Sequence, residues 1–140
     1  MTTKEYLGQI KKIDEYVKGK LRDIDELRDS SESISSMVFD KDRVVSSKSR
    51  GQLENIVTKI VDMDRQVGIF LDLRNKIMAQ LESLDADEYK VLYMRYVRCF
   101  SFPVIVEMLG IEGFGSESKI YRAHKQGLEN FELKFGETYM

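Results

Sequence analysis

Apolar residues recur every three or four positions from the start of the chain, and this spacing is typical of an amphipathic helix. It predicts a first long helix over residues 3 to about 34, in which Leu7 and Leu21 widen the apolar stripe. The stripe itself consists of Tyr6, Ile10, Ile13, Val17, Ile24, Leu27 and Ile34. Charges of both signs lie between these positions, so we expect the outer face of this helix to be solvated.

A second repeat begins near Gly51 and alternates spacings of three and four residues over more than four heptads. Its members are Leu53, Ile56, Ile60, Met63, Val67, Phe70, Arg74, Ile77, Leu81 and Leu84. Two seams of this length predict that the long helices pair as an antiparallel, coiled-coil-like hairpin. Arg74 interrupts the second seam, and we interpret it as a register device or as a side chain that reaches a carboxylate near an end of the hairpin.

The second helix has another apolar edge beside its seam, formed by Val57, Val61, Leu71, Leu73 and Met78. One partner helix does not cover both the seam and this edge, so we expect the chain to form a homodimer. The alternative is that the seam closes within a single chain as ordinary packing.

From Asp29 to Arg50, between the two long helices, serine is the commonest residue. We expect the first helix to end within this stretch, which places a connection at about residues 30–50. Apolar residues around Phe39 and Val44 make part of the connection too hydrophobic for a free linker, so we expect that part to fold back on a helix.

The remainder of the chain predicts three shorter helices. Asp85 and Glu88 resemble a capping arrangement at the start of the first, which carries several tyrosines and ends around residues 98–100. Ser101 is placed to cap the next helix, with Pro103 in its first turn. The buried stripe of that second helix is predicted to comprise Val104, Ile105, Met108 and Leu109.

Gly110 is predicted to stop this helix, and the turn Gly110–Gly115 then leads to the last one, which Ser116 caps. The buried positions of the last helix are predicted to be Ile120, Ala123, Leu128 and Phe131. Its outward positions are Glu117, Ser118, Lys119, Tyr121, Arg122, Lys125 and Gln126. Polar side chains early in a recognition helix meet base edges while Lys and Arg hold phosphates, so this pattern indicates a helix-turn-helix that enters a DNA groove.

Composition restricts the kind of DNA contact and the chemistry. The net charge of −2 argues against a protein that coats nucleic acid, because that task needs a large positive excess. The single cysteine and single histidine provide no metal-ligand spacing. We expect Cys99 to be buried and inert and His124 to be a packed or surface side chain, so we expect no enzyme, no metal and no cofactor.

The N-terminal residues lack the apolar run of a signal peptide, and no stretch approaches the roughly 20 apolar residues of a membrane span. We therefore expect a cytoplasmic protein without membrane contact. With a single proline and no tryptophan, the helical spacings predict an all-α chain, divided into a helical hairpin over residues 1–84, a small helical domain over residues 85–135 and a tail over residues 136–140.

Three short motifs of the C-terminal domain have a familiar order: MRY at Met94–Tyr96, VIVEMLG at Val104–Gly110 and SESKIYRAHKQGL at Ser116–Leu128. The region resembles the promoter-recognising fourth region of the major RNA polymerase sigma factors. More closely, most of the chain resembles phage-encoded sigma-like regulators related to the ArpU and RinA type late-gene activators. The resemblance extends to the opening KEYLGQIKKID, the segment RVVSS and the helix IVTKIVDMDRQV.

This resemblance implies a regulator of phage or prophage transcription, in which the helix from Ser116 is the recognition helix. Its partners would be promoter or operator DNA, RNA polymerase or another transcription factor, and a second copy of the chain. We expect Lys119, Arg122 and Lys125 to contact phosphates, with Ser116 at the cap and Glu117, Ser118, Tyr121 and Gln126 near bases.

Two other functions stay open at this point. The turn Gly110–Gly115 is longer than the usual three or four residues, and Val106 stands where a small residue is usual, so the recognition helix is expected to be displaced. A displaced helix favours a protein-interaction module that acts on a host transcription factor or polymerase without DNA contact. A DNA-packaging subunit, which also joins such helices to oligomerising ones, is the third possibility.

Overall fold

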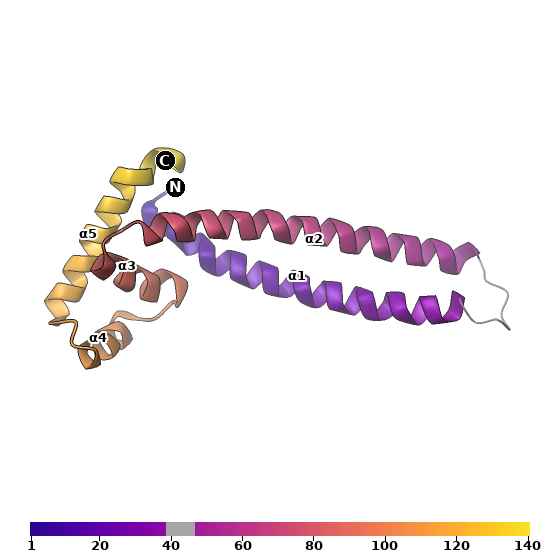
Figure 1. Cartoon of the computed structure of the whole chain (residues 1–140), viewed down its shortest axis with the longest axis horizontal. Coiled ribbons are helices and arrows are strands. Elements are labelled where there is room, and N and C mark those ends of the chain that lie inside the picture. The colour runs from indigo at the N-terminus through magenta and orange to yellow at the C-terminus, as the bar shows by residue number, and fades with distance from the viewer. Residues whose placement is uncertain (39–46) are drawn as a thin grey trace. The chain divides into compact units, whose positions relative to one another are not determined.

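The computed structural model describes residues 1–38 and 47–140, and within them the chain is helical with no strand (Figure 1). The predicted all-α class is thus confirmed for this part of the chain. The α-helices are α1 (Thr3–Val38), α2 (Ser47–Glu82), α3 (Ala86–Leu92), α4 (Phe102–Ile111) and α5 (Glu117–Phe135). A π-helical turn, Tyr93–Val97, continues α3, and a 3₁₀ turn, Gly136–Thr138, follows α5.

Both long helices continue farther into the serine-rich stretch than expected. α1 ends at Val38 and not near residue 34, and α2 begins at Ser47 and not near Gly51. Serine lowers helix stability by only about half a kcal/mol per residue relative to alanine, so a helix already packed along its seam passes through several serines. The predicted fold-back around Phe39 and Val44 lies outside the described residues.

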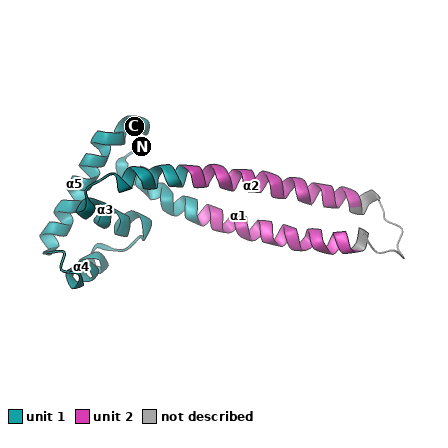
Figure 2. Cartoon of the chain, in the orientation of Figure 1, with its two compact units in different colours: residues 1–14, 73–140 teal, residues 15–72 magenta. Residues whose placement is uncertain are grey.

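The chain divides into two compact units (Figure 2). Unit 1 comprises Met1–Asp14 and Leu73–Met140, and unit 2 comprises Glu15–Asp72. The start of α1 and the end of α2 therefore belong to the same core as the three shorter helices. The predicted domain boundary between residues 84 and 85 stays a prediction.

Unit 2 consists of the remainder of α1 and α2, which run in opposite directions. The Tyr16 and Phe70 rings are tilted against each other with 4.5 Å between their centroids, and Arg28 lies 3.8 Å from Asp64. Residue numbers therefore rise along one helix as they fall along the other. In this unit the buried apolar side chains are Val17, Ile24 and Val67. Most other seam residues of α2 are half-buried, because two helices alone shield only part of each other's apolar stripe.

The first core cluster of unit 1 joins both long helices to the C-terminal part of the chain. Its buried members are Tyr6, Leu7, Ile10, Ile77, Leu81, Leu84, Leu92 and Phe131. At its edge the Tyr6 hydroxyl donates to Gln80 Oε1 at 2.6 Å. Arg74 donates from Nε to Asp14 Oδ1 at 2.7 Å, which confirms the predicted pairing of this arginine with a carboxylate.

A second cluster lies between α3, α4 and α5. It consists of Val91, Met94, Ile105, Leu109, Ile120 and Ala123. Leu92 belongs to the first cluster while its neighbour Val91 belongs to the second, so α3 is the shared wall between the two cores.

α3 and α5 approach each other closely at Gly127. A Cβ atom at this position would lie 3.0 Å from Leu92 Cδ1 and 3.3 Å from Glu88 Cβ, so glycine is what permits the contact. Beside it, the buried carboxylate of Glu88 accepts from Asn130 Nδ2 at 2.7 Å. A helix begins at Asp85 as predicted, with Asp85 in the N-cap position. The predicted side-chain capping is wrong, because Glu88 turns inward to α5 and Asp85 makes no side-chain cap bond.

The expectations for α4 need two corrections. Gly110 does not stop the helix, which continues to Ile111; the residue with the left-handed backbone is Gly113, with φ of 75°. Ile105 and Leu109 are buried as predicted, but Val104 and Met108 are exposed, because the core lies on one side of α4 only. The connection between α4 and α5 is therefore Glu112–Ser116.

Cys99 was expected to be buried and is exposed. Cys99 follows the π-helical turn and adopts a φ of 58°. This left-handed backbone directs its side chain to solvent, whereas the neighbouring apolar side chains enter the core. In the described part of the chain, no helix is long and apolar enough to cross a membrane.

Replacing Gly127 with leucine is expected to lower the free energy of unfolding by about 1–3 kcal/mol, because the new side chain overpacks the contact with Leu92. Urea denaturation followed by circular dichroism measures the change. The matched control is Gly8→Ala, a helical position at which a Cβ meets nothing within 4 Å. That control should stabilise the protein by up to about 1 kcal/mol, and equal effects of both substitutions would contradict the close packing.

Candidate nucleic-acid interface

α5 begins at a well-formed cap. Ser116 has extended backbone geometry, and its side chain accepts a hydrogen bond from the Lys119 amide at 3.4 Å. The predicted cap is thus confirmed. The buried positions Ile120, Ala123 and Phe131 are confirmed as well, while Leu128 is only half-buried.

Every side chain predicted to face outward is exposed: Glu117, Ser118, Lys119, Tyr121, Arg122, Lys125 and Gln126. At about 100° per residue, these positions fall into three groups around the helix. Ser118, Arg122 and Lys125 point most directly away from the core. Lys119 and Gln126 lie on the flank toward α3, and Glu117 and Tyr121 lie on the opposite flank.

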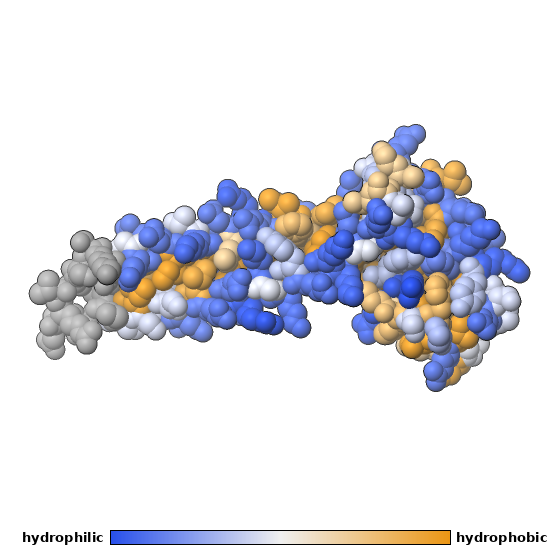
Figure 3. Space-filling view, turned by 180° about the vertical axis from the view of Figure 1, so that it is seen from behind, coloured by the Kyte–Doolittle hydropathy of each residue, from blue (hydrophilic) through white to orange (hydrophobic). Residues whose placement is uncertain are grey.

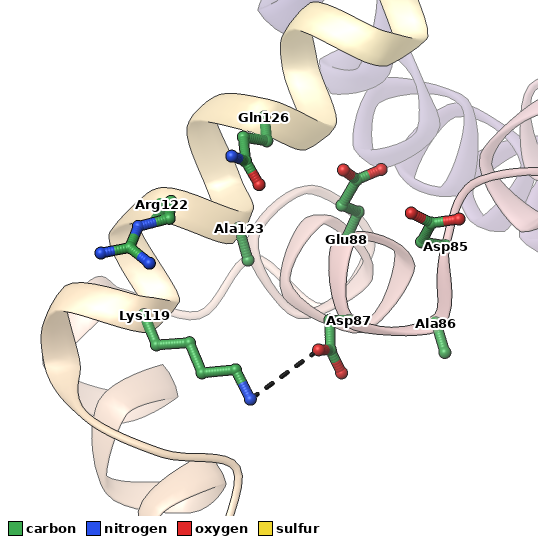
Figure 4. A pocket seen from close by; sticks show the side chains of 8 residues that line it. All are labelled: Asp85, Ala86, Asp87, Glu88, Lys119, Arg122, Ala123 and Gln126. Carbon is green, nitrogen blue, oxygen red and sulfur yellow. Dashed lines mark ion pairs between the residues drawn. The ribbon is translucent and has the colours of Figure 1, made fainter.

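The flank toward α3 is a groove of about 410 Å³ that has carboxylates on one wall and basic or amide groups on the other (Figure 4). Its lining residues are Asp85, Ala86, Asp87, Glu88, Lys119, Arg122, Ala123 and Gln126. Lys119 Nζ donates to the carbonyl oxygen of Phe114 at 2.9 Å and lies 3.8 Å from Asp87 Oδ2. Part of the charge of Lys119 is therefore already satisfied within the chain.

The opposite flank of α5 is built from aromatic rings and cations. Phe102 stacks on Tyr121 with 4.8 Å between ring centroids and meets the His124 ring edge-on at 4.9 Å. The guanidinium of Arg95 lies 4.8 Å from the centre of the Phe102 ring. These contacts hold Tyr121 in place while leaving part of its ring exposed.

The pKa of His124 is shifted by its burial and by charges near this flank. Burial, and then the positive charges of Lys4 and Arg95, lower the pKa of His124, and its Nε2 is hydrogen-bonded to the Tyr96 hydroxyl at 3.0 Å. The side chain is half-buried and packed, as expected. Lys4 and Arg95, which are distant from α5 in sequence, thus place positive charge near His124 on this helix.

Sequence reasoning did not include Lys4 or Arg95 in the site. Neither belongs to the recognition-like helix, and Lys4 is separated from it by more than a hundred residues. The aromatic residues just before Phe102 could have indicated that Arg95 belongs to the site, because arginine often stacks on exposed aromatic rings. In the described residues, no group of three or more His, Cys, Asp or Glu side chains is placed to hold a metal ion.

The lowered pKa of His124 predicts a pH dependence of stability. The unfolded chain takes up this proton near about pH 6.5 and the folded chain only at lower pH, so the contribution of neutral His124 is fully present above about pH 6.5 and is lost as the pH falls below it. His124→Gln should reduce this loss, measured as the free energy of unfolding between neutral and mildly acidic pH. Tyr16→Phe, which removes a tyrosine hydroxyl from unit 2 and retains the imidazole with its partner Tyr96, is the control and should keep the slope. An unchanged slope in His124→Gln would contradict the assignment.

Comparison of the chain with protein-family models, with curated proteins and with solved structures gave no match. The features that bear on function are therefore the capped helix α5, its outward polar row, and its two unlike flanks.

Proposed function

We propose that this chain is a sigma-like transcription regulator, of the kind encoded by phages and prophages, that binds promoter or operator DNA. In this proposal α4, the connection Glu112–Ser116 and α5 form a helix-turn-helix, and α5 is the recognition helix. The observation that carries the proposal is the exposed outward row Ser118, Arg122 and Lys125 on a capped helix, with the Arg95 guanidinium 4.8 Å from the Phe102 ring on its Tyr121 flank.

The roles of individual side chains follow from their placement. Arg122 and Lys125 are exposed on the outward row, so we assign them to phosphates, and Lys4 and Arg95 add positive charge on the Tyr121 side. Near bases we place the polar side chains of the first two turns and the adjacent flank: Ser116, Glu117, Ser118, Tyr121 and Gln126. Lys119 is a weaker phosphate ligand than its position suggests, because Asp87 and the Phe114 carbonyl already hold it.

So few cations make a single DNA-binding unit a weak binder, since each phosphate contact contributes counterion release. The regulator therefore needs a second anchor, either RNA polymerase, another transcription factor or a second copy of the chain. The two long helices, pairing as a coiled-coil-like hairpin, would provide the surface for that anchor. We assign the protein no enzymatic activity and no cofactor, and we place it in the cytoplasm, where such a regulator works.

A second candidate function is a protein-interaction module that acts on a host transcription factor or polymerase without DNA contact. The groove beside Lys119 favours it, because the exposed acids Asp85 and Asp87 repel phosphate and attract a basic partner. A pull-down that retrieves polymerase, together with no mobility shift on phage DNA at low salt, would select this function.

Replacing Arg122 and Lys125 together with alanine is expected to weaken binding to a promoter-containing phage DNA fragment at all sequences tested. The loss of two phosphate contacts should reduce the slope of log affinity against log salt by about 1.8, at about 0.9 for each contact. Fluorescence anisotropy over a salt series measures both quantities.

The control for this double variant is Lys18→Ala with Lys59→Ala, which removes the same charge from exposed positions of unit 2. It should leave the salt slope unchanged. Equal losses in the two double variants would show a general charge effect and would remove the proposed face of α5.

Asp87→Asn tests whether the acidic wall opposes DNA. Removal of this carboxylate takes away one of the two groups that hold Lys119 and lowers the negative potential of the groove, so affinity for the same DNA fragment should rise several-fold at low salt. Asp72→Asn, which makes the same charge change at an exposed position of unit 2, is the control. A rise that is equal in both variants, or absent from Asp87→Asn, would show that DNA does not approach this groove.

A further inference from the structure

One flank of α2 in unit 2 carries a stripe of residues beside the seam that faces α1. The stripe consists of Val57, Val61, Asp64, Gly68 and Leu71, spaced alternately four and three residues apart. At about 100° per residue it lies about a quarter turn from the seam that faces α1. Val57, Val61 and Leu71 are 48%, 60% and 38% exposed.

The two helices of unit 2 do not bury all of the apolar surface that they carry. Ile56, Ile60 and Met63 lie on the seam and are still half-buried, and hydrophobic residues are visible on the surface of this unit (Figure 3). Helices of this kind usually close a core in sets of three or four. The stripe therefore lies where an additional helix would complete the layer.

We propose that the additional helix is α2 of a second copy of this chain, packed antiparallel on the stripe. Gln66 lies midway between Val61 and Leu71 and midway between Asp64 and Gly68. A two-fold axis on the stripe at the level of Gln66, whose own side chain accepts from Tyr16 of α1, consequently places Val61 against Leu71 of the partner subunit and Asp64 against Gly68 of the partner subunit. Antiparallel helices pair unlike heptad positions in this way, and the two-fold axis makes every contact occur twice.

Gly68 and the charges favour this register over a parallel one. A Cβ atom at Gly68 would meet nothing within 4 Å, so the surface there is open and admits a close neighbour. Asp64 then faces a position without a side chain and keeps its own partner Arg28, 3.8 Å away. A parallel pair would instead set Asp64 against the identical carboxylate and glycine against glycine, which costs repulsion and leaves a void.

Dimerisation is expected in the protein alone. The proposed function needs a second anchor, and this pairing identifies that anchor as a second copy of the chain. The pairing itself depends only on residues of unit 2. Sedimentation and crosslinking without DNA therefore report on it whether or not promoter binding is found. Sedimentation equilibrium should give a dimer mass at high micromolar concentration, and a monomer mass throughout the accessible range would overturn the proposal.

Gly68→Leu should weaken the dimer at least tenfold in dissociation constant, because the leucine occupies the space opposite Asp64. Leucine has a higher helix propensity than glycine, so the chain itself should stay folded, which circular dichroism checks. The control is Gly19→Leu on α1, another helical position where a Cβ meets nothing within 4 Å. A dimer that Gly68→Leu leaves intact would place the interface elsewhere.

Disulfide trapping tests the direction of the pair. In a Cys99→Ser background, chains with Val61→Cys are mixed with chains carrying Leu71→Cys and oxidised, and the expected product is the mixed 61–71 disulfide. Val61→Cys chains alone should not crosslink, because a two-fold axis at Gln66 separates the two copies of residue 61 by about 15 Å along the helix. Efficient crosslinking of Val61→Cys with itself would show a parallel pair and overturn the register.

Discussion

The close approach of α3 and α5 at Gly127 is the contact on which unit 1 depends. Leu92 and Glu88 occupy the space that a side chain at position 127 would need. Because α3 separates the two core clusters, this one contact sets the position of α5 against both of them. The bond from Asn130 to the buried Glu88 carboxylate then fixes the rotation of α5, and with it the side chains that face solvent.

The same contact brings the basic side of α5 next to the start of α3. Asp85 and Asp87 lie at the N-terminal end of α3, where carboxylates favour helix formation through the helix dipole. Close packing places these acids beside Lys119 and Arg122. The residues that favour the start of α3 therefore place negative charge on one flank of α5, whereas Arg95 stacks over Phe102 on the Tyr121 flank.

The hydrophobic periodicity predicted the features that depend on residues close together in sequence. It failed for features that depend on contacts between residues far apart in sequence. The helical class, the cap at Ser116, the buried Ile120 and Phe131, and the exposed row on α5 all follow from local spacing. The inward turn of Glu88 was missed, because its partner Asn130 lies forty-two residues away. The exposure of Cys99 was missed because a π-helical turn, which shifts the phase of the helix, leaves no clear mark in the hydrophobic pattern.

A chain with a net charge of −2 can bind DNA only by concentrating its few free cations on one surface. Arg122 and Lys125 have this role in the proposed function because they are exposed side by side on α5, whereas Lys119 is already engaged by groups of its own chain. The proposed pairing of two copies through α2 would double the number of these cations without changing any charge in the chain. It would also make the second DNA contact intramolecular, so that two weak sites would act at a high effective concentration. The two proposals are therefore linked: the weaker the proposed single DNA contact, the more DNA binding would depend on the helices that join two copies.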